Sequence, residues 1–403
     1  MQMKFLLSEI LMLTILYGMG GRAEMPQKFD EIVQGNNHFC FNLYKNLTES
    51  ETGNIFCSPF SITMALAMVY EGARGWVQGE MQGVFKFPLD NKIRQESFLS
   101  LYQHLNRKNA KYKLNIANAL WIQKDYTILP AYLKIIQRYY DGYARNVDFV
   151  GAPEQSRQII NKWVEEKTDQ KIKDLFPPGS IDQQSRLVVT NAIYFKGQWI
   201  KQFDKSLTSE ADFWVTETKS IKVQMMKRID PEAKFNYAET DEFQILEMAY
   251  EGGDLSMIII LPRKNDIRTI EKELTIEKFQ EWKNLLTETR VEVYLPKFTF
   301  RTRYTLTPNL SQLGMPNAFS PHCDFSGIDG TKNLYIRSVV HQAFVDVNEE
   351  GTEAAAATGV VVGITSVGPQ IPVFRADHPF IFVIQEKTTG NILFIGRVVE
   401  PEA

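Results

Sequence analysis

The stretch Glu349-Glu-Gly-Thr-Glu-Ala-Ala-Ala-Ala-Thr-Gly-Val-Val-Val-Gly-Ile-Thr-Ser-Val-Gly368 differs from the rest of this sequence in its composition, which is dominated by small and β-branched residues. It has no proline after Gly351, so every backbone N–H is free to join a sheet ladder. Four alanines favour a helix, but the glycines and the β-branched run Val360–Val362 oppose one. Side chains of a strand alternate between two faces, and here one face holds only small or apolar residues: Thr352, Ala354, Ala356, Thr358, Val360, Val362 and Ile364.

This composition fits two kinds of strand and leaves both open. One is a permanently paired hydrophobic strand, and the other is a strand that enters a sheet after the fold has formed. Small side chains lower the obstacle to entry into a close-packed interior. A central strand also pairs on both edges, at roughly 0.5–1.5 kcal/mol net per hydrogen bond, which sums to about ten kcal/mol over such a stretch. That total is comparable to the stability of a whole domain.

Outside this stretch, apolar periodicity predicts helices early in the chain and strands late. The expected helices cover 29–47, 61–70, 95–105, 131–139, 156–168 and 276–286. The expected strands cover 187–195, 243–250, 255–261, 290–295, 340–347 and 380–384. Because helices and strands do not alternate regularly, we expect an α+β fold, with one domain over 25–403.

Composition excludes several classes of function. Of 403 residues, 44% are hydrophobic and 23% charged, as in soluble globular proteins, and the net charge of -3 gives no general attraction for nucleic acid. Three cysteines, an odd number, exclude a disulfide framework that pairs them all. Beyond the N-terminal segment no stretch approaches the roughly 20 apolar residues that cross a bilayer, so we expect no membrane span. The five histidines lack metal-ligand spacing, and we expect no metal and no cofactor.

Residues 1–24 resemble a secretory signal peptide, with Lys4, an apolar run over 5–19 and small residues at Gly21-Arg-Ala23. Glu9 interrupts the run and Met25 offers an alternative start, so we expect a secreted protein and keep an intracellular one as the alternative. Sequons at Asn46 and Asn309 fit export but decide little, because such matches arise by chance in a long chain.

Several blocks of the sequence, in order, resemble the serpin family of serine protease inhibitors from about residue 29 to the C-terminus. They are Asn54-Ile-Phe-Cys-Ser-Pro-Phe-Ser61, Thr190-Asn-Ala-Ile-Tyr-Phe-Lys-Gly-Gln-Trp199, Asp324-Phe-Ser-Gly-Ile328, Val340-His-Gln-Ala343, Glu349 to Thr358, His378-Pro-Phe380 and Leu393-Phe-Ile-Gly-Arg397. The resemblance implies the serpin fold, with helices around three β-sheets and an exposed reactive loop at about 350–374. It also implies a monomer that is cleaved in this loop by a serine protease, inserts the loop into its main sheet and traps the protease covalently.

The resemblance assigns roles to particular positions. The inhibitory hinge is matched by Glu350, Gly351, Thr352, Ala354, Ala355, Ala356, Ala357 and Thr358. The family's spacing places the cleaved bond at Thr365-Ser366, with Ile364 and Val362 as fallback positions. The region where the sheet opens is matched by a buried polar group, Ser58, Ser61, Asn191 and His341, and by Trp199 near the loop's entry. Arg107, Lys108, Lys111 and Lys113 lie where some relatives bind sulfated polysaccharide, but a solvated helix end is the better explanation of these four residues.

The target class follows by exclusion. Between Thr352 and Phe374 the chain has no lysine, arginine or aromatic residue, so a trypsin-like or deep aromatic pocket has nothing to bind. We therefore expect an elastase-like or subtilisin-like protease, with a cysteine protease as a further class.

Two alternatives to inhibition stay open. One is a non-inhibitory serpin that acts as a carrier or chaperone, although such members usually have charged, bulky or proline residues in the hinge. The other is a hydrolase, but Gly363-Ile-Thr-Ser-Val-Gly368 misses the nucleophile-elbow spacing by one residue. On balance we expect an inhibitor rather than an enzyme.

Overall fold

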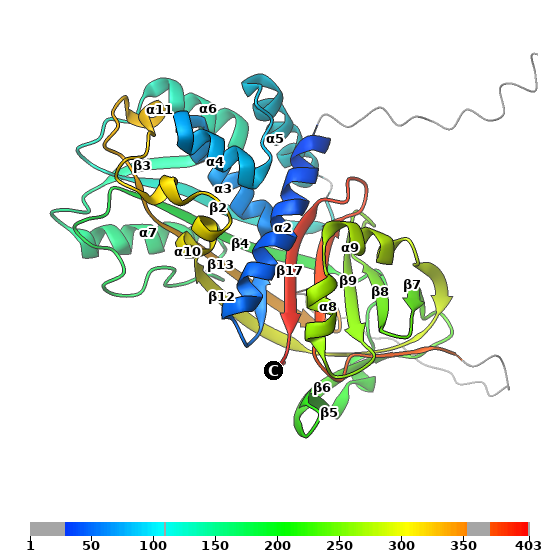
Figure 1. Cartoon of the computed structure of the whole chain (residues 1–403). Helices are drawn as coiled ribbons and strands as arrows, with labels where there is room; N and C mark the ends of the chain where they lie inside the picture. Colours follow the sequence, from blue (N-terminus) through cyan, green and yellow to red (C-terminus); the bar gives the residue numbers. More distant parts are fainter. Residues whose placement is uncertain (1–28, 109, 353–370, 402–403) are drawn as a thin grey trace, which may run out of the picture.

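A computed structural model describes residues 29–108, 110–352 and 371–401. Within these ranges helices and three sheets form one body, in which the long helix α2 (Asp30–Ser50) lies alongside the C-terminal strand β17 (Ile392–Val398) (Figure 1). The expected signal peptide, residues 1–24, lies outside the described residues.

The six-stranded sheet is the main structural element of the functional argument. Its strand order is β12-β13-β14-β4-β2-β3. The strands are β12 (Phe298–Thr305), β13 (Ile336–Asn348), β14 (Gly351–Thr352), β4 (Leu187–Gln198), β2 (Tyr112–Gln123) and β3 (Tyr143–Val147). Nearly every residue of β4 is buried, as expected for a strand with packed layers on both faces.

The other two sheets complete the α+β architecture. The seven-stranded sheet has the order β1 (Ile55–Cys57), β17, β16 (Phe380–Glu386), β9 (Leu255–Pro262), β8 (Phe243–Ala249), β7 (Lys234–Glu239) and β10 (Thr287–Arg290). The four-stranded sheet has the order β15 (Val373–Arg375), β11 (Glu292–Pro296), β6 (Lys219–Arg228) and β5 (Ser209–Thr216).

Helices cover the sheets at both ends of the molecule (Figure 1). They are α3 (Pro59–Gly72), α4 (Gly75–Phe85), α5 (Asn91–Leu105), α6 (Pro130–Tyr140), α7 (Pro153–Lys167), α8 (Ile267–Glu273), α9 (Ile276–Lys283), α10 (Thr307–Gln312) and α11 (Ser326–Asp329), with 3-10 turns η1 (Lys205–Leu207) and η2 (Pro316–Phe319). Helix α3 begins where the Ser58 hydroxyl accepts the Ser61 backbone N–H at 3.2 Å and Pro59 occupies the first turn. All residues of α3 are buried, so it runs through the core.

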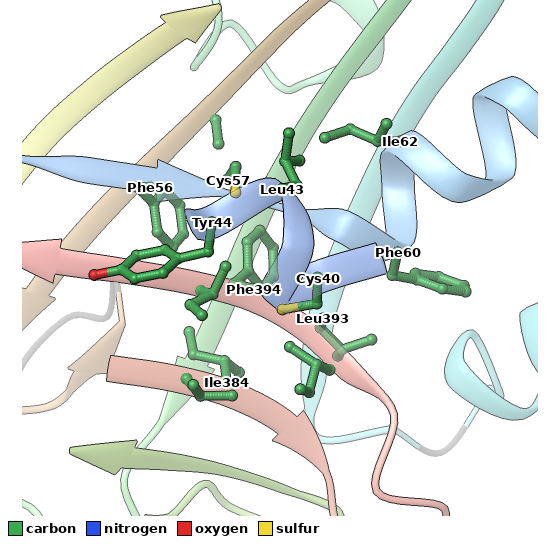
Figure 2. Packing of buried hydrophobic residues seen from close by; sticks show 14 of the residues in the cluster. Cys40, Leu43, Tyr44, Phe56, Cys57, Phe60, Ile62, Ile384, Leu393 and Phe394 are labelled. Atoms are coloured by element: carbon green, nitrogen blue, oxygen red, sulfur yellow. The ribbon is translucent and has the colours of Figure 1, made fainter. Parts of the chain in front are cut away.

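The six-stranded sheet separates two hydrophobic clusters. The larger one joins α2, α3, β1 and the β16–β17 hairpin, and Figure 2 shows Leu43, Phe56, Phe60, Ile384 and Phe394 among its members. The smaller cluster lies on the other face, between the sheet and α7 with the segment that follows it. Each face of β4 and β13 therefore packs against its own layer.

Two expected elements differ in the structure. The strand expected over 290–295 corresponds to β11 from Glu292 onward, but Arg290 ends β10, which belongs to the seven-stranded sheet and not to the four-stranded sheet of β11. The chain crosses between the sheets at Val291, whose N–H donates to the Ala233 carbonyl at 2.9 Å. The helix expected over 276–286 ends at Lys283. Among the described residues no helix is both long enough and apolar enough to span a membrane.

Candidate functional site

The seam between β13 and β4 changes along its length. The two strands pair in parallel over eight residue pairs, from Ile336 with Leu187 to Phe344 with Tyr194. Beyond that point β14 lies between them, with Thr352 opposite Val347 on one side and Gly197 on the other. The parallel pairs close the seam between β13 and β4 along most of its length. At one end the two strands separate, and β14, the start of the expected hinge, lies between them and is antiparallel to both.

The two residues of β14 fit this opening closely. Thr352 is 1% exposed, and its hydroxyl lies 2.8 Å from the Tyr250 hydroxyl. Gly351 has a φ of +155°, and a Cβ atom there would lie 2.1 Å from the Gly197 carbonyl oxygen. Only glycine, which has no Cβ atom, avoids this collision with backbone atoms. The opening beside β4 is therefore just wide enough for the glycine that the sequence places at position 351.

Two buried carboxylates precede β14. Glu349 pairs with Lys297 at 3.1 Å and accepts the Thr208 hydroxyl at 2.9 Å. Burial raises the pKa of Glu349, but its backbone N–H, Thr208 and Lys297 together hold that pKa below its ordinary value. Glu350 pairs with Lys205 at 2.5 Å through one oxygen, while its second oxygen has no hydrogen-bond partner among the described residues. These contacts attach the residues before β14 to η1, to Thr208 just after it, and to Lys297 between β11 and β12.

Trp199 connects the end of β4 to the same hinge. Its backbone N–H donates to the Glu350 carbonyl at 2.8 Å, and its indole N–H donates to the Asn348 carbonyl at 3.1 Å. The indole stacks on Tyr250, with ring centroids 4.4 Å apart. Trp199 therefore lies beside Asn348 and Glu350, the residues that lead into β14.

The other four residues of the expected opening cluster lie together lower in the seam. Asn191 faces His341 across it, and the His341 Nδ1 lies 2.5 Å from the Asn191 Oδ1. Asn191 also donates to the Ser61 hydroxyl at 2.5 Å, and the Ser58 backbone N–H donates to the His341 Nε2 at 3.1 Å. Asn118 of β2, which the sequence analysis did not single out, donates to the Ser61 carbonyl at 3.3 Å.

The hydrogen bonds of His341 define its protonation. Its Nε2 accepts a backbone N–H, so the proton of the neutral ring sits on Nδ1 and is donated to Asn191. Burial lowers the pKa of His341 to about 3, which keeps the ring neutral at physiological pH. His341 is therefore a hydrogen-bonded bridge across the seam.

A strap formed by residues 168–181 crosses the outer face of the same seam. Ile172, Leu175 and Phe176 of the strap belong to the hydrophobic cluster that includes Tyr194 and Phe344. The Lys171 ammonium lies 5.9 Å from the ring centres of both Tyr194 and Phe344, the last parallel pair before the opening. The strap is also strained, since three residues have positive φ: Asp169, Gln170 and Asp174.

Other expected positions have mixed outcomes. The hinge residues Ala354, Ala355, Ala356, Ala357 and Thr358, the bond Thr365-Ser366 and the fallbacks Ile364 and Val362 lie outside the described residues. Within the basic patch, Arg107 pairs with Asp254 and Lys113 pairs with Asp169, so half of that charge is neutralised locally. No cluster of potential metal ligands occurs in the described ranges.

The two sequon asparagines contact each other. The Asn309 amide donates to the Asn46 Oδ1 at 2.7 Å, and the Asn46 amide donates to Gln312 at 2.8 Å. Each amide nitrogen carries two protons, so a glycan would replace one of them and leave the other to donate in this contact.

Sequence reasoning missed several residues of the site. Tyr250, Lys205, Lys297 and Lys171 approach it from distant segments, and nothing in their local sequence separates them from other surface or strand residues. Gly252 and Gly253 have positive φ and indicate a tight turn after Tyr250. They do not indicate that Tyr250 itself contacts the site.

Comparisons with known proteins agree with this geometry. A family model described as Serpin (serine protease inhibitor) matches residues 34–401. An uncharacterised serpin-like protein of Methanosarcina acetivorans is 43% identical over 374 residues, which cover 92% of this chain and 87% of that protein. The leukocyte elastase inhibitor of Bos taurus is 42% identical over 382 residues, covering 92% of this chain and 100% of the inhibitor.

The likeness extends to solved structures. The crystal structure of uncleaved ovalbumin superimposes with a TM-score of 0.84 at 32% identity, covering 92% of this chain and 100% of that chain. The three-sheet architecture, the residues matched by the family model and the identity to the curated relatives agree, and this chain therefore belongs to the serpin family.

Proposed function

We propose that this serpin inhibits a serine protease as a suicide substrate, acting as bait and trap and not as a catalyst. The observation that carries the proposal is β14, which already lies antiparallel between β13 and β4 and is continuous with the small, proline-free segment that follows Thr352. The chain thus has both an entry point between β13 and β4 and, directly after it, a segment whose sequence suits insertion there.

The register of β14 supports further entry. Each step forward along the hinge is one step back along both β13 and β4, because β14 is antiparallel to each. Continued in this register, Ala356 enters between Ala343 and Ile193. Thr358 then enters between His341 and Asn191 and replaces their mutual hydrogen bond. A threonine hydroxyl can both donate and accept, so it can pair with either group.

The same register assigns a face to each residue. Ala354, Ala356 and Val360 would point into the larger cluster, beside residues such as Val345 and Val339. Ala355 would enter on the other face, between Phe344 and Tyr194, beneath Lys171. Alanine is small enough to pass there without displacing either ring, which gives a reason for the alanine run.

The proposed reaction begins at Thr365-Ser366. The protease serine attacks the Thr365 carbonyl, an ester forms as the peptide C–N bond breaks, and the proton passes to the new amine of Ser366. Insertion of residues 353 onward then moves the acyl-linked protease by about 40 Å, at roughly 3.3 Å per residue. The lack of basic and aromatic residues in the loop supports elastase-like or subtilisin-like targets.

The test is incubation of the full chain with an elastase-like and a subtilisin-like protease, followed by a denaturing gel. A complex that survives denaturation supports trapping, and mass spectrometry of the released peptide identifies the bond, with a fragment that begins at Ser366 expected. Cleavage without any complex would leave a non-inhibitory serpin, and efficient trapping of trypsin alone would refute the target class.

Two variants sharpen this test. Thr352→Arg places a charged chain where the native side chain is buried between two strands, so cleavage should continue while complex formation is lost. Gln370→Arg adds the same charge beyond the cleaved bond, outside the inserting segment, and should keep complex formation.

Export is a separate proposal that rests on residues 1–24 alone. Expression of the full chain in a secretory cell, with N-terminal sequencing of the medium and the lysate, tests it. A mature N-terminus near Glu24 in the medium supports cleavage, whereas an intact Met1 confined to the lysate favours the intracellular alternative.

A further inference from the structure

We infer that a small cavity beside Trp199 is a binding site for a single-ring aromatic monocarboxylate. This hinge cavity has a volume of about 180 Å³ and lies among residues 199–201, 234–236 and 247–249, with Glu288 and Lys387. A protein cavity of about 150 Å³ holds benzene, so one ring with a short side chain fits this volume.

The hinge cavity has an apolar floor and a polar mouth. Trp199, Phe235 and Met248 are buried, whereas Lys234 is exposed and Ile200 is 54% exposed. An occupant would therefore place its ring inside against aromatic and thioether groups and keep a polar group at the mouth. That division matches an aromatic acid better than a wholly apolar molecule or a sugar.

Charge selects an anion. Three lysines and two glutamates line the hinge cavity, which leaves an excess of one positive charge: Lys201, Lys234, Lys387, Glu247 and Glu288. The carboxylate of Glu247 is already engaged, because Lys387 lies 3.7 Å from one oxygen and the Asn236 amide donates to the other at 2.6 Å. Lys201 lies over the Phe235 ring at 5.2 Å, so its ammonium stands beside the floor where a ring would pack. One carboxylate would balance the excess charge.

The position of the hinge cavity links it to the hinge. Trp199 lines the cavity and also donates hydrogen bonds to the carbonyls of Asn348 and Glu350. Ile200 and Ala249 line it too, and the Ile200 backbone N–H donates to the Ala249 carbonyl. An occupant would hold the indole against Tyr250 and keep these bonds in place. This consequence rests on the proposed inhibitory function: an occupied cavity slows loop insertion, so more serpin is cleaved for each protease molecule trapped.

The binding test is isothermal titration calorimetry of the intact chain with phenylacetate, and with phenylacetamide and acetate as neutral and ring-free analogues. We expect a dissociation constant on the order of 1 mM or below for phenylacetate. The amide should bind about tenfold more weakly, and acetate should give no measurable heat. Equal binding of phenylacetate and phenylacetamide, or no binding of either, would overturn the inference.

Variants locate the site. Ala249→Leu fills the hinge cavity and should abolish phenylacetate binding, and Lys234→Met should weaken it about five- to tenfold. Lys92→Met removes an exposed lysine of α5 far along the chain and should leave binding unchanged. Retained affinity in Ala249→Leu, with a native thermal transition, would place the ligand elsewhere and refute the site.

The linked consequence has its own readout. With elastase, saturating phenylacetate should raise the number of serpin molecules cleaved per complex by about twofold or more, and Ala249→Leu should remove that response. An unchanged ratio despite proven binding refutes the coupling. Absence of any complex without phenylacetate would instead contradict the proposed inhibitory function and leave the binding result standing.

Discussion

A single cut in the reactive loop should make this protein more heat-resistant, because it frees residues 353 onward to enter the seam between β13 and β4. The cut is best made close to Thr365-Ser366 by a metalloprotease, which forms no acyl-enzyme and leaves after cleavage. Both fragments should stay associated, since β16 and β17 on the C-terminal side are buried within the seven-stranded sheet.

The size of the gain follows from the ladders. Entry replaces the parallel β13–β4 ladder of eight residue pairs by two antiparallel ladders of similar length. That is a net gain of about eight backbone hydrogen bonds, or roughly 4–12 kcal/mol at 0.5–1.5 kcal/mol each. With an unfolding entropy of about 2 cal/mol/K per residue, the melting temperature should rise by roughly 5–15 °C.

The assay is differential scanning calorimetry of intact and cut protein under the same conditions. Ala355→Arg places a long cation between Phe344 and Tyr194 during entry, so its cut form should melt where its intact form does. Gln370→Arg adds the same charge beyond the cut and should keep the full gain. An unchanged melting temperature in the cut wild-type chain would refute the idea of a segment held outside its most stable position.

The remaining predictions concern single residues. Because burial lowers the pKa of His341 to about 3, below the value near 6.5 of the unfolded chain, the stability it contributes is present above pH 6.5 and is lost as the pH falls. Urea unfolding should show a loss of about 1.4 kcal/mol per unit from pH 6 to pH 4, and a His341→Gln variant that folds should show a flatter profile. Lys205→Met leaves the buried Glu350 carboxylate without its ion pair, so the urea midpoint should fall by a few tenths molar, and an unchanged midpoint would show that solvent replaces the lysine. Lys171→Met removes the cation above Tyr194 and Phe344, so stopped-flow measurement should show insertion about two- to fivefold faster, and a slower rate would refute its role as a restraint.

Much of the fold could be predicted from local patterns. Helices α2, α3, α5 and α6 follow apolar periodicity, and the order of helices and strands indicated an α+β architecture. Helix α4 gave a weak signal because glycine occupies three of its positions, and packing supplies the helix stability that propensity does not. Strand β12 alternates between buried and more exposed residues from Phe298 to Thr305, which is the period-two pattern of a strand with one buried face.

The site was only partly predictable. Ser58, Ser61, Asn191 and His341 come from three separated segments, and only the family resemblance predicted that they meet. Contacts across more than 100 residues, such as that of Lys205 with Glu350, leave no local trace. Long side chains reach such partners from surfaces where any polar residue would satisfy the sequence pattern.

Strand β17 constrains how this molecule is made. It lies between β16 and the edge strand β1 in the seven-stranded sheet and alongside α2, so one of the last segments to be synthesised packs against some of the first (Figure 1). A ribosome-bound chain lacks this strand until translation is nearly finished, so α2 and β1 must wait with their apolar surfaces uncovered. Truncation of even the final dozen residues should therefore yield aggregated protein during biosynthesis, although the reactive loop itself is intact.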